Sequence, residues 1–346
     1  MHKRGWKGRR GSVIWLEHDS RVLKGNPWGD PTRRMVGVYT SAGYDPCRLQ
    51  PYPLLMALAG YFGSAPSHAS FKVGSENIPE RIDRLVHSGA MQDCVVVFAD
   101  AFTSLGGNQY VNSQAVGRYE DWIIDEILPF VEAKFNAGGR KIYRGIFGKS
   151  SGGFGALHHG LSRPDVWGAL ACHSGDMGFD ACYKPDLYLL ADFLNAHKGD
   201  PVRAVRKYWD QNKPSQSDGM AMMMLGMAAT YDARPGRSGK FNLPFSHLPR
   251  GEIDEKSWAR WKRWDPLERV KTKKGQAALK SMALCFIDVG RRDQFRMLYG
   301  TRQMVHELNK RGIRHSYEEF DDNHSGIDYR LDLSLPKLVQ ALQGPQ

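Results

Sequence analysis

A Gly-x-Ser-x-Gly pattern between an expected strand and an expected helix constrains this chain most. Gly148, Ser150 and Gly152 form the pattern, and an apolar run over 142–147 precedes it. At such a strand-to-helix turn the glycines avoid collisions, while the serine is held in a strained backbone at the top of a sheet. The pattern therefore predicts a parallel α/β sheet with Ser150 as a nucleophile.

The same residues invite a nucleotide-binding interpretation, because Gly148-Lys149-Ser150 resembles the end of a phosphate-binding loop. That loop needs a glycine five residues before Gly148, where its backbone turns around the phosphates. Tyr143 stands at that position. We therefore favour the nucleophile turn.

A serine hydroxyl needs a base to remove its proton, and on this type of sheet an acid and a histidine follow the serine in that order. Asp293 follows an expected strand at 282–289, and His324 follows another at 316–320. Both fall at the carboxyl ends of adjacent strands, so we predict His324 as base and Asp293 as its acid. Asp288 is a competing acid, but it lies inside the strand. The other histidines near these elements are expected to be surface or core residues: His158, His159, His306 and His315.

Two backbone N–H groups are needed to stabilise the anion that forms on the substrate. Ser151, directly after the nucleophile, is predicted to supply one. The expected strand at 54–59 runs into a turn at Gly60, where we predict the N–H of Tyr61 as the second donor. Gly60, Tyr61 and Lys149 are also predicted to contact substrate, and this chemistry requires no metal and no organic cofactor.

Strands and helices are expected to alternate on either side of the middle of the chain. Apolar runs predict further strands at 34–40 and 94–100, and helical spacing predicts helices at 119–131, 295–310 and from about 333. A strand-helix-strand order implies right-handed crossovers between parallel strands. The expected fold is an α/β-hydrolase fold, a mostly parallel central sheet flanked by helices.

Residues 176–275 interrupt this alternation. Methionines crowd 220–227, and Trp258, Trp261 and Trp264 recur at a spacing of three. We interpret the segment as an inserted lid or cap whose Met and Trp stripes form a small core of its own. The catalytic domain would then comprise 20–175 and 276–346, after a basic tail at 1–19.

The net charge of +11 comes mainly from two segments of the chain. The first ten residues carry five basic groups and no acid, and residues 176–275 carry 18 basic against 13 acidic residues. No nucleic-acid-binding motif accompanies them, so no nucleic-acid partner is expected. No run of 18 or so apolar residues predicts a membrane span or membrane partner, and no apolar stretch suggests a signal peptide, which favours a cytoplasmic location. The five scattered cysteines predict neither a disulfide framework nor a zinc site.

The chain resembles the esterase family of α/β hydrolases that includes esterase D, feruloyl and acetyl-xylan esterases, enterochelin esterases and mycolyltransferases. The likeness covers about residues 20–175 and 280–340. The residues that carry it are the Ser150 turn, the Ala59-Gly60 turn, the stretch 106–113, the loop 290–293 and the loop at His324. Two positions depart from the family pattern: Ala59 replaces a usual histidine, and Ser151 replaces a methionine common after the nucleophile. Neither change removes a backbone donor.

The resemblance implies a serine esterase that hydrolyses carboxylic esters through an acyl-enzyme on Ser150. Its partner would be a small-molecule or polymer-linked ester, and a homo-oligomer is possible. Two alternatives stay open. An acyltransferase would use the same acyl-enzyme and form transfer products with added alcohols. A non-catalytic ligand-binding protein would not react with a fluorophosphonate probe.

Overall fold

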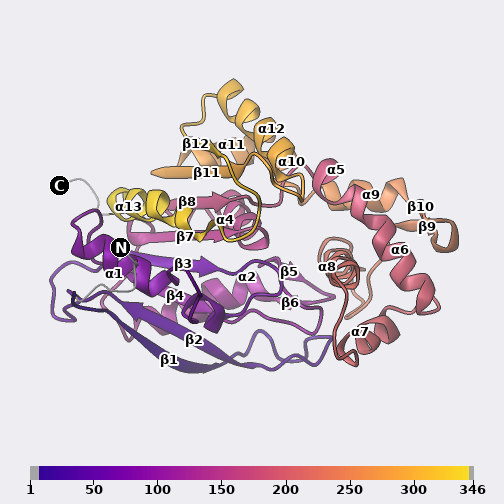
Figure 1. The fold of residues 1–346 in the computed structure, drawn as a ribbon, viewed down its shortest axis with the longest axis horizontal. Coiled ribbons are helices and arrows are strands. Elements are labelled where there is room, and N and C mark those ends of the chain that lie inside the picture. The colour runs from indigo at the N-terminus through magenta and orange to yellow at the C-terminus, as the bar shows by residue number, and fades with distance from the viewer. Residues whose placement is uncertain (1–7, 343–346) are drawn as a thin grey trace.

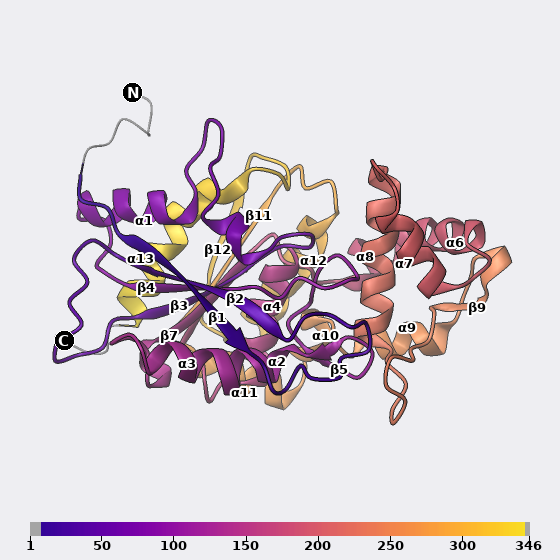
Figure 2. The same ribbon diagram turned by 90° about the horizontal axis from the view of Figure 1, so that it is seen from below.

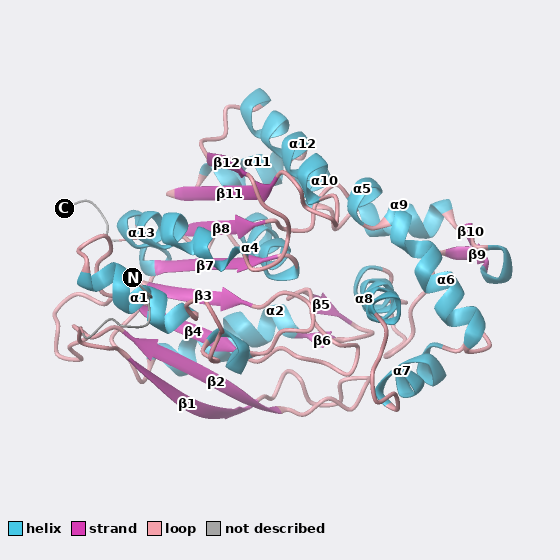
Figure 3. Ribbon diagram, in the orientation of Figure 1, coloured by secondary structure: helices cyan, strands magenta, loops and turns pink. Residues whose placement is uncertain are grey.

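An eight-stranded sheet organises the computed structural model, which describes residues 8–342 (Figures 1 and 3). The strand order is β1-β2-β4-β3-β7-β8-β11-β12. The strands from β4 to β12 in this order run parallel, β2 runs antiparallel to β4, and β1 pairs antiparallel with β2. The predicted mostly parallel sheet is thus confirmed. The strands are β1 (Ser12–Asp19), β2 (Arg33–Thr40), β3 (Leu54–Leu58), β4 (Val95–Ala99), β7 (Arg144–Lys149), β8 (Ala169–His173), β11 (Leu284–Gly290) and β12 (Ser316–Phe320).

Helices cover both faces of the sheet, which is why its central strands are apolar throughout their length. Every residue of β3, β4 and β8 is buried. On one face lie α1 (Ile78–His87) and α13 (Leu331–Ala341), whose apolar residues share one core cluster with Phe147 and Phe286. Figure 2 shows both helices on the side of the sheet opposite α3. The helical elements of the other face are α2 (Tyr119–Asp121), a π-helical turn (Trp122–Ile127), α3 (Leu128–Glu132), α4 (Ser151–Ser162) and α12 (Met297–Lys310).

Between β8 and β11 the chain forms mainly helices. Figure 1 shows α6, α7 and α8 beyond the ends toward which the arrows of β3, β7 and β8 point. By contrast, α10 and α11 pack against α4, beside the sheet. The elements of this segment are α5 (Phe179–Cys182), α6 (Leu187–Ala196), α7 (Pro201–Trp209), α8 (Gln216–Tyr231), β9 (Phe245–His247), β10 (Glu252–Ile253), α9 (Glu255–Lys262), α10 (Pro266–Arg269) and α11 (Lys273–Lys280).

The Met and Trp stripes do not form a separate core, contrary to the sequence prediction. Trp261 packs on Tyr231 with ring centroids 5.6 Å apart, and Tyr231 packs on Phe154 of α4 at 5.7 Å. The buried methionines of α8 belong to the same cluster as the core beside the sheet. The last turn of α8 lies against α4, so the apolar residues of segment 176–275 merge with the core beside the sheet.

The N-terminal prediction also needs correction. Residues 12–19, part of the predicted basic tail, instead form β1, an edge strand in register with β2 from Ser12–Thr40 to Asp19–Arg33. Its half-exposed, alternating burial gives only a weak apolar pattern, which is typical of an edge strand. The tail's first basic residues, Lys3, Arg4 and Lys7, lie outside the described residues.

β5 (Asn112–Ser113) and β6 (Gly117–Arg118) form a short antiparallel ladder. Within residues 8–342, no helix combines the length and the apolar character needed to cross a membrane.

Candidate active site

Ser150 lies between β7 and α4 in a backbone conformation that a serine rarely adopts. Its φ is 57° and its ψ is −124°. The flanking glycines make this turn possible: a Cβ on Gly148 would lie 2.7 Å from the Leu58 carbonyl oxygen, and one on Gly152 would lie 2.9 Å from the Ala59 carbonyl oxygen. Side chains at either position would collide with the end of β3, so close backbone packing requires glycine at both positions.

Asp293 and His324 meet at the carboxyl edge of the sheet. Asp293 follows β11, His324 follows β12, and His324 Nδ1 lies 2.7 Å from Asp293 Oδ2. The Asp293 carboxylate also accepts a hydrogen bond from the backbone N–H of Phe295 at 2.9 Å, and its side chain is fully buried. A carboxylate held in this way fixes the imidazole tautomer with the proton on Nδ1, which leaves Nε2 as the free base.

Ser150 and His324 line one cavity of about 210 Å³, which we call the Ser150 cavity. Neither Ser150 Oγ nor His324 Nε2 has a hydrogen-bond partner among residues 8–342. Such bonds are often long without substrate and shorten when it binds. The cavity walls are mostly apolar and include Phe295 and Met297, with Met220 and Met223 contributed by α8.

The turn after β3 lies against Ser150. A Cβ on Gly60 would come within 3.6 Å of Ser150 Cβ. Within the described chain, the backbone N–H groups of Tyr61 and Ser151 have no hydrogen-bond acceptor, whereas the N–H of Phe62 donates to Gly106 at 2.9 Å. Tyr61 and Lys149, predicted with Gly60 to contact substrate, also line the Ser150 cavity.

A buried polar chain beside the nucleophile was not predicted. Gln109 Nε2 donates to Ser151 Oγ at 2.8 Å, Ser151 Oγ donates to Asp176 Oδ2 at 3.2 Å, and the Tyr183 hydroxyl donates to the same oxygen at 2.6 Å. Asp176 is 1% exposed, lines the Ser150 cavity, and its Oδ1 has no hydrogen-bond partner among the described residues. Sequence reasoning treated Asp176 only as the start of an insertion. The available signal was its place just after the apolar run of β8, at the same sheet edge as Ser150.

Burial raises the pKa of Asp176, against the hydrogen bonds from Tyr183 and Ser151 and the nearby charge of His324, which lower it. A carboxyl group whose pKa is higher in the folded than in the unfolded state stabilises the fold only while it is protonated. Its contribution to stability is therefore present at low pH and is lost as the pH rises above the unfolded-state value of about 3.9.

Asp288, the competing acid, belongs to a different network. His173 Nδ1 lies 2.7 Å from Asp288 Oδ1, Arg330 Nε donates to Asp288 Oδ2 at 2.9 Å, and His173 Nε2 lies 2.8 Å from Ser334 Oγ. This pair is enclosed under α13, so it does not contact His324.

Two histidines expected to be surface or core residues are buried in α4. His158 Nε2 lies 2.6 Å from a Glu120 carboxylate oxygen, and His159 Nε2 donates to the backbone carbonyl of Tyr110 at 2.9 Å. Both side chains thus have structural partners beneath the nucleophile turn.

Comparison with known proteins identifies the relatives of this chain. A family model described as "Putative esterase" matches residues 31–337. No match was found among curated proteins.

Several solved structures share the fold. A ferulic acid esterase is 18% identical, with a TM-score of 0.63, and the match covers 97% of this chain and 100% of that one. An S-formylglutathione hydrolase from Agrobacterium tumefaciens is 15% identical, with a TM-score of 0.58 and 97% of each chain covered. FphF, a fluorophosphonate-binding serine hydrolase of Staphylococcus aureus, is 14% identical, with a TM-score of 0.59 and coverage of 95% and 99%. These likenesses establish the α/β-hydrolase fold.

The turn geometry yields a stability prediction. Gly152→Ala places a methyl group against the end of β3, so we expect the free energy of unfolding to fall by about 1–3 kcal/mol. Denaturant unfolding with an unchanged slope measures this. Gly219→Ala, within α8, is the control, because the atoms nearest to the added Cβ, on Phe62 and Tyr208, lie 3.9 Å away and alanine favours a helix. Equal stability of Gly152→Ala and the wild-type protein would contradict the packing argument.

A second prediction concerns Asp176. Asp176→Asn keeps the shape of the side chain and removes the buried charge, so its melting temperature relative to wild type should be higher at pH 8 than at pH 4. Thermal unfolding across that range measures the difference. Asp210→Asn, at an exposed site after α7, serves as the control. A difference that does not change with pH would refute the assignment.

Proposed function

The chain belongs to the esterase family whose model it matches and is a carboxylic ester hydrolase, and we propose that it works through an acyl-enzyme on Ser150. The observation that carries this proposal is the convergence of three distant residues. Ser150 stands at a strained turn and lines the Ser150 cavity together with His324. Asp293 Oδ2 lies 2.7 Å from Nδ1 of the His324 imidazole.

In the proposed reaction His324 Nε2 removes the proton from Ser150 Oγ, which attacks the ester carbonyl carbon. Asp293 holds the imidazole orientation and stabilises its positive charge. The proton then passes to the departing alcohol as the ester C–O bond breaks, which leaves the acyl group on Ser150. Water, deprotonated by the same imidazole, releases the carboxylic acid and restores the serine.

The N–H groups of Ser151 and Tyr61 are proposed to stabilise the negative charge on the carbonyl oxygen of the intermediate. Both donors are unpaired within residues 8–342, and the Gly60 turn approaches the nucleophile closely. The start of α4 points its N-terminus at the same place, where the helix dipole favours a negative charge. Ser151 replaces the methionine common in the family, yet its backbone donor remains.

Residues 176–275 are proposed to act as a cap that shapes the pocket for the substrate. Two of its methionines, Met220 and Met223, line the Ser150 cavity together with Phe295 of the catalytic domain. Flexible methionine side chains and an aromatic ring suit an apolar acyl group.

The nucleophile assignment is tested with Ser150→Ala. Loss of the attacking oxygen should lower kcat for nitrophenyl esters by roughly 10⁴- to 10⁶-fold while thermal unfolding stays unchanged. A fluorophosphonate probe should label wild-type protein and Ser88→Ala, whose serine is exposed at the end of α1, but not Ser150→Ala. Undiminished ester cleavage by Ser150→Ala would end the proposal.

The cap proposal predicts a change in acyl-chain preference. Met223→Ala enlarges the Ser150 cavity, so the ratio of kcat/KM for a hexanoyl ester to that for an acetyl ester should rise about tenfold. Val202→Ala, at an exposed position on α7, should leave the ratio at the wild-type value. If both variants behave alike, α8 does not limit acyl length.

A further inference from the structure

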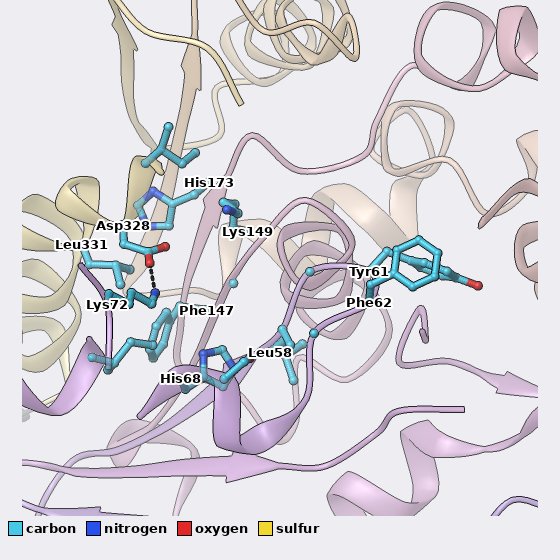
Figure 4. A pocket seen from close by; sticks show the side chains of 17 residues that line it. Leu58, Tyr61, Phe62, His68, Lys72, Phe147, Lys149, His173, Asp328 and Leu331 are labelled. Carbon is cyan, nitrogen blue, oxygen red and sulfur yellow. Dashed lines mark hydrogen bonds and ion pairs between the residues drawn. The ribbon is translucent and has the colours of Figure 1, made fainter. Parts of the chain in front are cut away.

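A second cavity of about 360 Å³ adjoins the nucleophile on the α1 and α13 side of the sheet; we call it the Lys72 cavity (Figure 4). Its apolar walls include Ile78, Phe147 and Leu331, which belong to the core cluster of that face. Gly60, Tyr61, Phe62 and Lys149 line both cavities. The two cavities are therefore neighbours beside Ser150.

The charged groups of the Lys72 cavity leave one positive charge uncompensated. Lys72 and Asp328 form an ion pair, drawn as a dashed line in Figure 4. Lys149, half-buried, has no ion-pair partner in the part of the chain that the structure describes. Burial opposes ionisation of Asp328, but the hydrogen bond and charge of Lys72 and the charge of Lys149 together lower its pKa. Asp328 thus stays ionised and cancels only one of the two ammonium charges.

His68 does not alter this balance at neutral pH. Burial lowers the pKa of His68 to about 4; the charge of Asp328 opposes this shift, and the charges of Lys72 and Lys149 add to it. His173 is committed to Asp288 and Ser334 through its two ring nitrogens. The net charge facing the cavity is therefore about that of one lysine.

We propose that the Lys72 cavity binds a carboxylate carried by the ester substrate, with the Lys149 ammonium group as its main contact. An ammonium group beside apolar walls is poorly solvated, so an anionic partner gains more there than at an open surface. One surplus positive charge matches a monoanion better than a doubly charged phosphate. Because Lys149 directly precedes Ser150 in the chain, the anion would lie next to the reacting ester. This inference rests on the proposed esterase function and narrows its substrates to esters with a carboxylate on one side.

The test compares matched esters that differ only in charge. For the acyl side, 4-nitrophenyl hydrogen glutarate is compared with 4-nitrophenyl glutaramate. For the alcohol side, 4-acetoxybenzoate is compared with 4-acetoxybenzamide. The measured quantity is the ratio of kcat/KM for the carboxylate ester to kcat/KM for its carboxamide. In one of the two pairs, we expect Lys149→Met to lower this ratio about tenfold, and Lys149→Arg to keep it at the wild-type value. High salt should reduce the ratio in the wild type.

Two further variants make the test specific. Lys72→Met leaves the negative charge of Asp328 in the cavity, so it should lower the ratio as well. Lys24→Met removes one positive charge from an exposed site outside both cavities and should leave the ratio at the wild-type value. A ratio that is the same in wild type, Lys149→Met and Lys72→Met for both pairs would overturn the inference while the esterase function stands.

If turnover is lost, binding measurements still distinguish the proposed carboxylate site from the proposed esterase function. Calorimetric titration of the same four compounds into Ser150→Ala and into Ser150→Ala with Lys149→Met requires no catalysis. Tighter binding of a carboxylate than of its amide, about tenfold and dependent on Lys149, would support the anion site even if no ester were cleaved. Equal binding of each pair would overturn it.

Discussion

The contact between the end of β3 and the turn after β7 is the constraint on which the site depends. Two backbones approach so closely there that Gly148 and Gly152 have no room for a Cβ, and Ser150 is held at a positive φ. The same contact brings Gly60 beside Ser150 and leaves the N–H groups of Tyr61 and Ser151 without acceptors in the described chain. Strain at one residue is thus maintained by the packing of its neighbours, as is usual for functional turns.

Two buried His–Asp pairs lie at the same edge of the sheet, and their surroundings separate their roles. The Asp293–His324 pair is formed by loops that follow β11 and β12, and its histidine faces a cavity. The Asp288–His173 pair lies within the strands and is closed off by Arg330 and Ser334. The two pairs therefore differ in their access to Ser150, because loop residues project beyond the sheet and strand residues stay within it.

The segment between β8 and β11 is structurally continuous with the rest of the molecule. Its aromatic residues Phe179 and Tyr231 pack against Phe154 in the first turn of α4, and Asp176, just after β8, is hydrogen-bonded to Ser151. A segment anchored in this way presents Met220 and Met223 to the Ser150 cavity from a well-packed helix. The pocket is consequently built from two parts of the chain that share one core.

Much of this architecture was predictable because its signals are local. The strand-turn-helix around Ser150, the buried run of β4, and the loops bearing Asp293 and His324 each depend on a short stretch of sequence with its own periodicity. The order of the parallel strands brings such loops to one edge without further information. The single helix expected at 119–131 was found as α2, a π-helical turn and α3, since periodicity locates a helix but does not define its hydrogen bonding.

What the sequence by itself determined, then, is on which kind of element Ser150, Asp293 and His324 each lie. Only the tertiary structure decided how the segments meet: the pairing of β1 with β2, the merging of α8 with the core, the polar chain from Gln109 to Tyr183, and the surplus charge of Lys149 beside the Lys72–Asp328 pair. These features join residues tens to hundreds of positions apart. Contacts at such separations depend on how whole layers of helices and strands pack. The periodicity of a short stretch of sequence does not predict them.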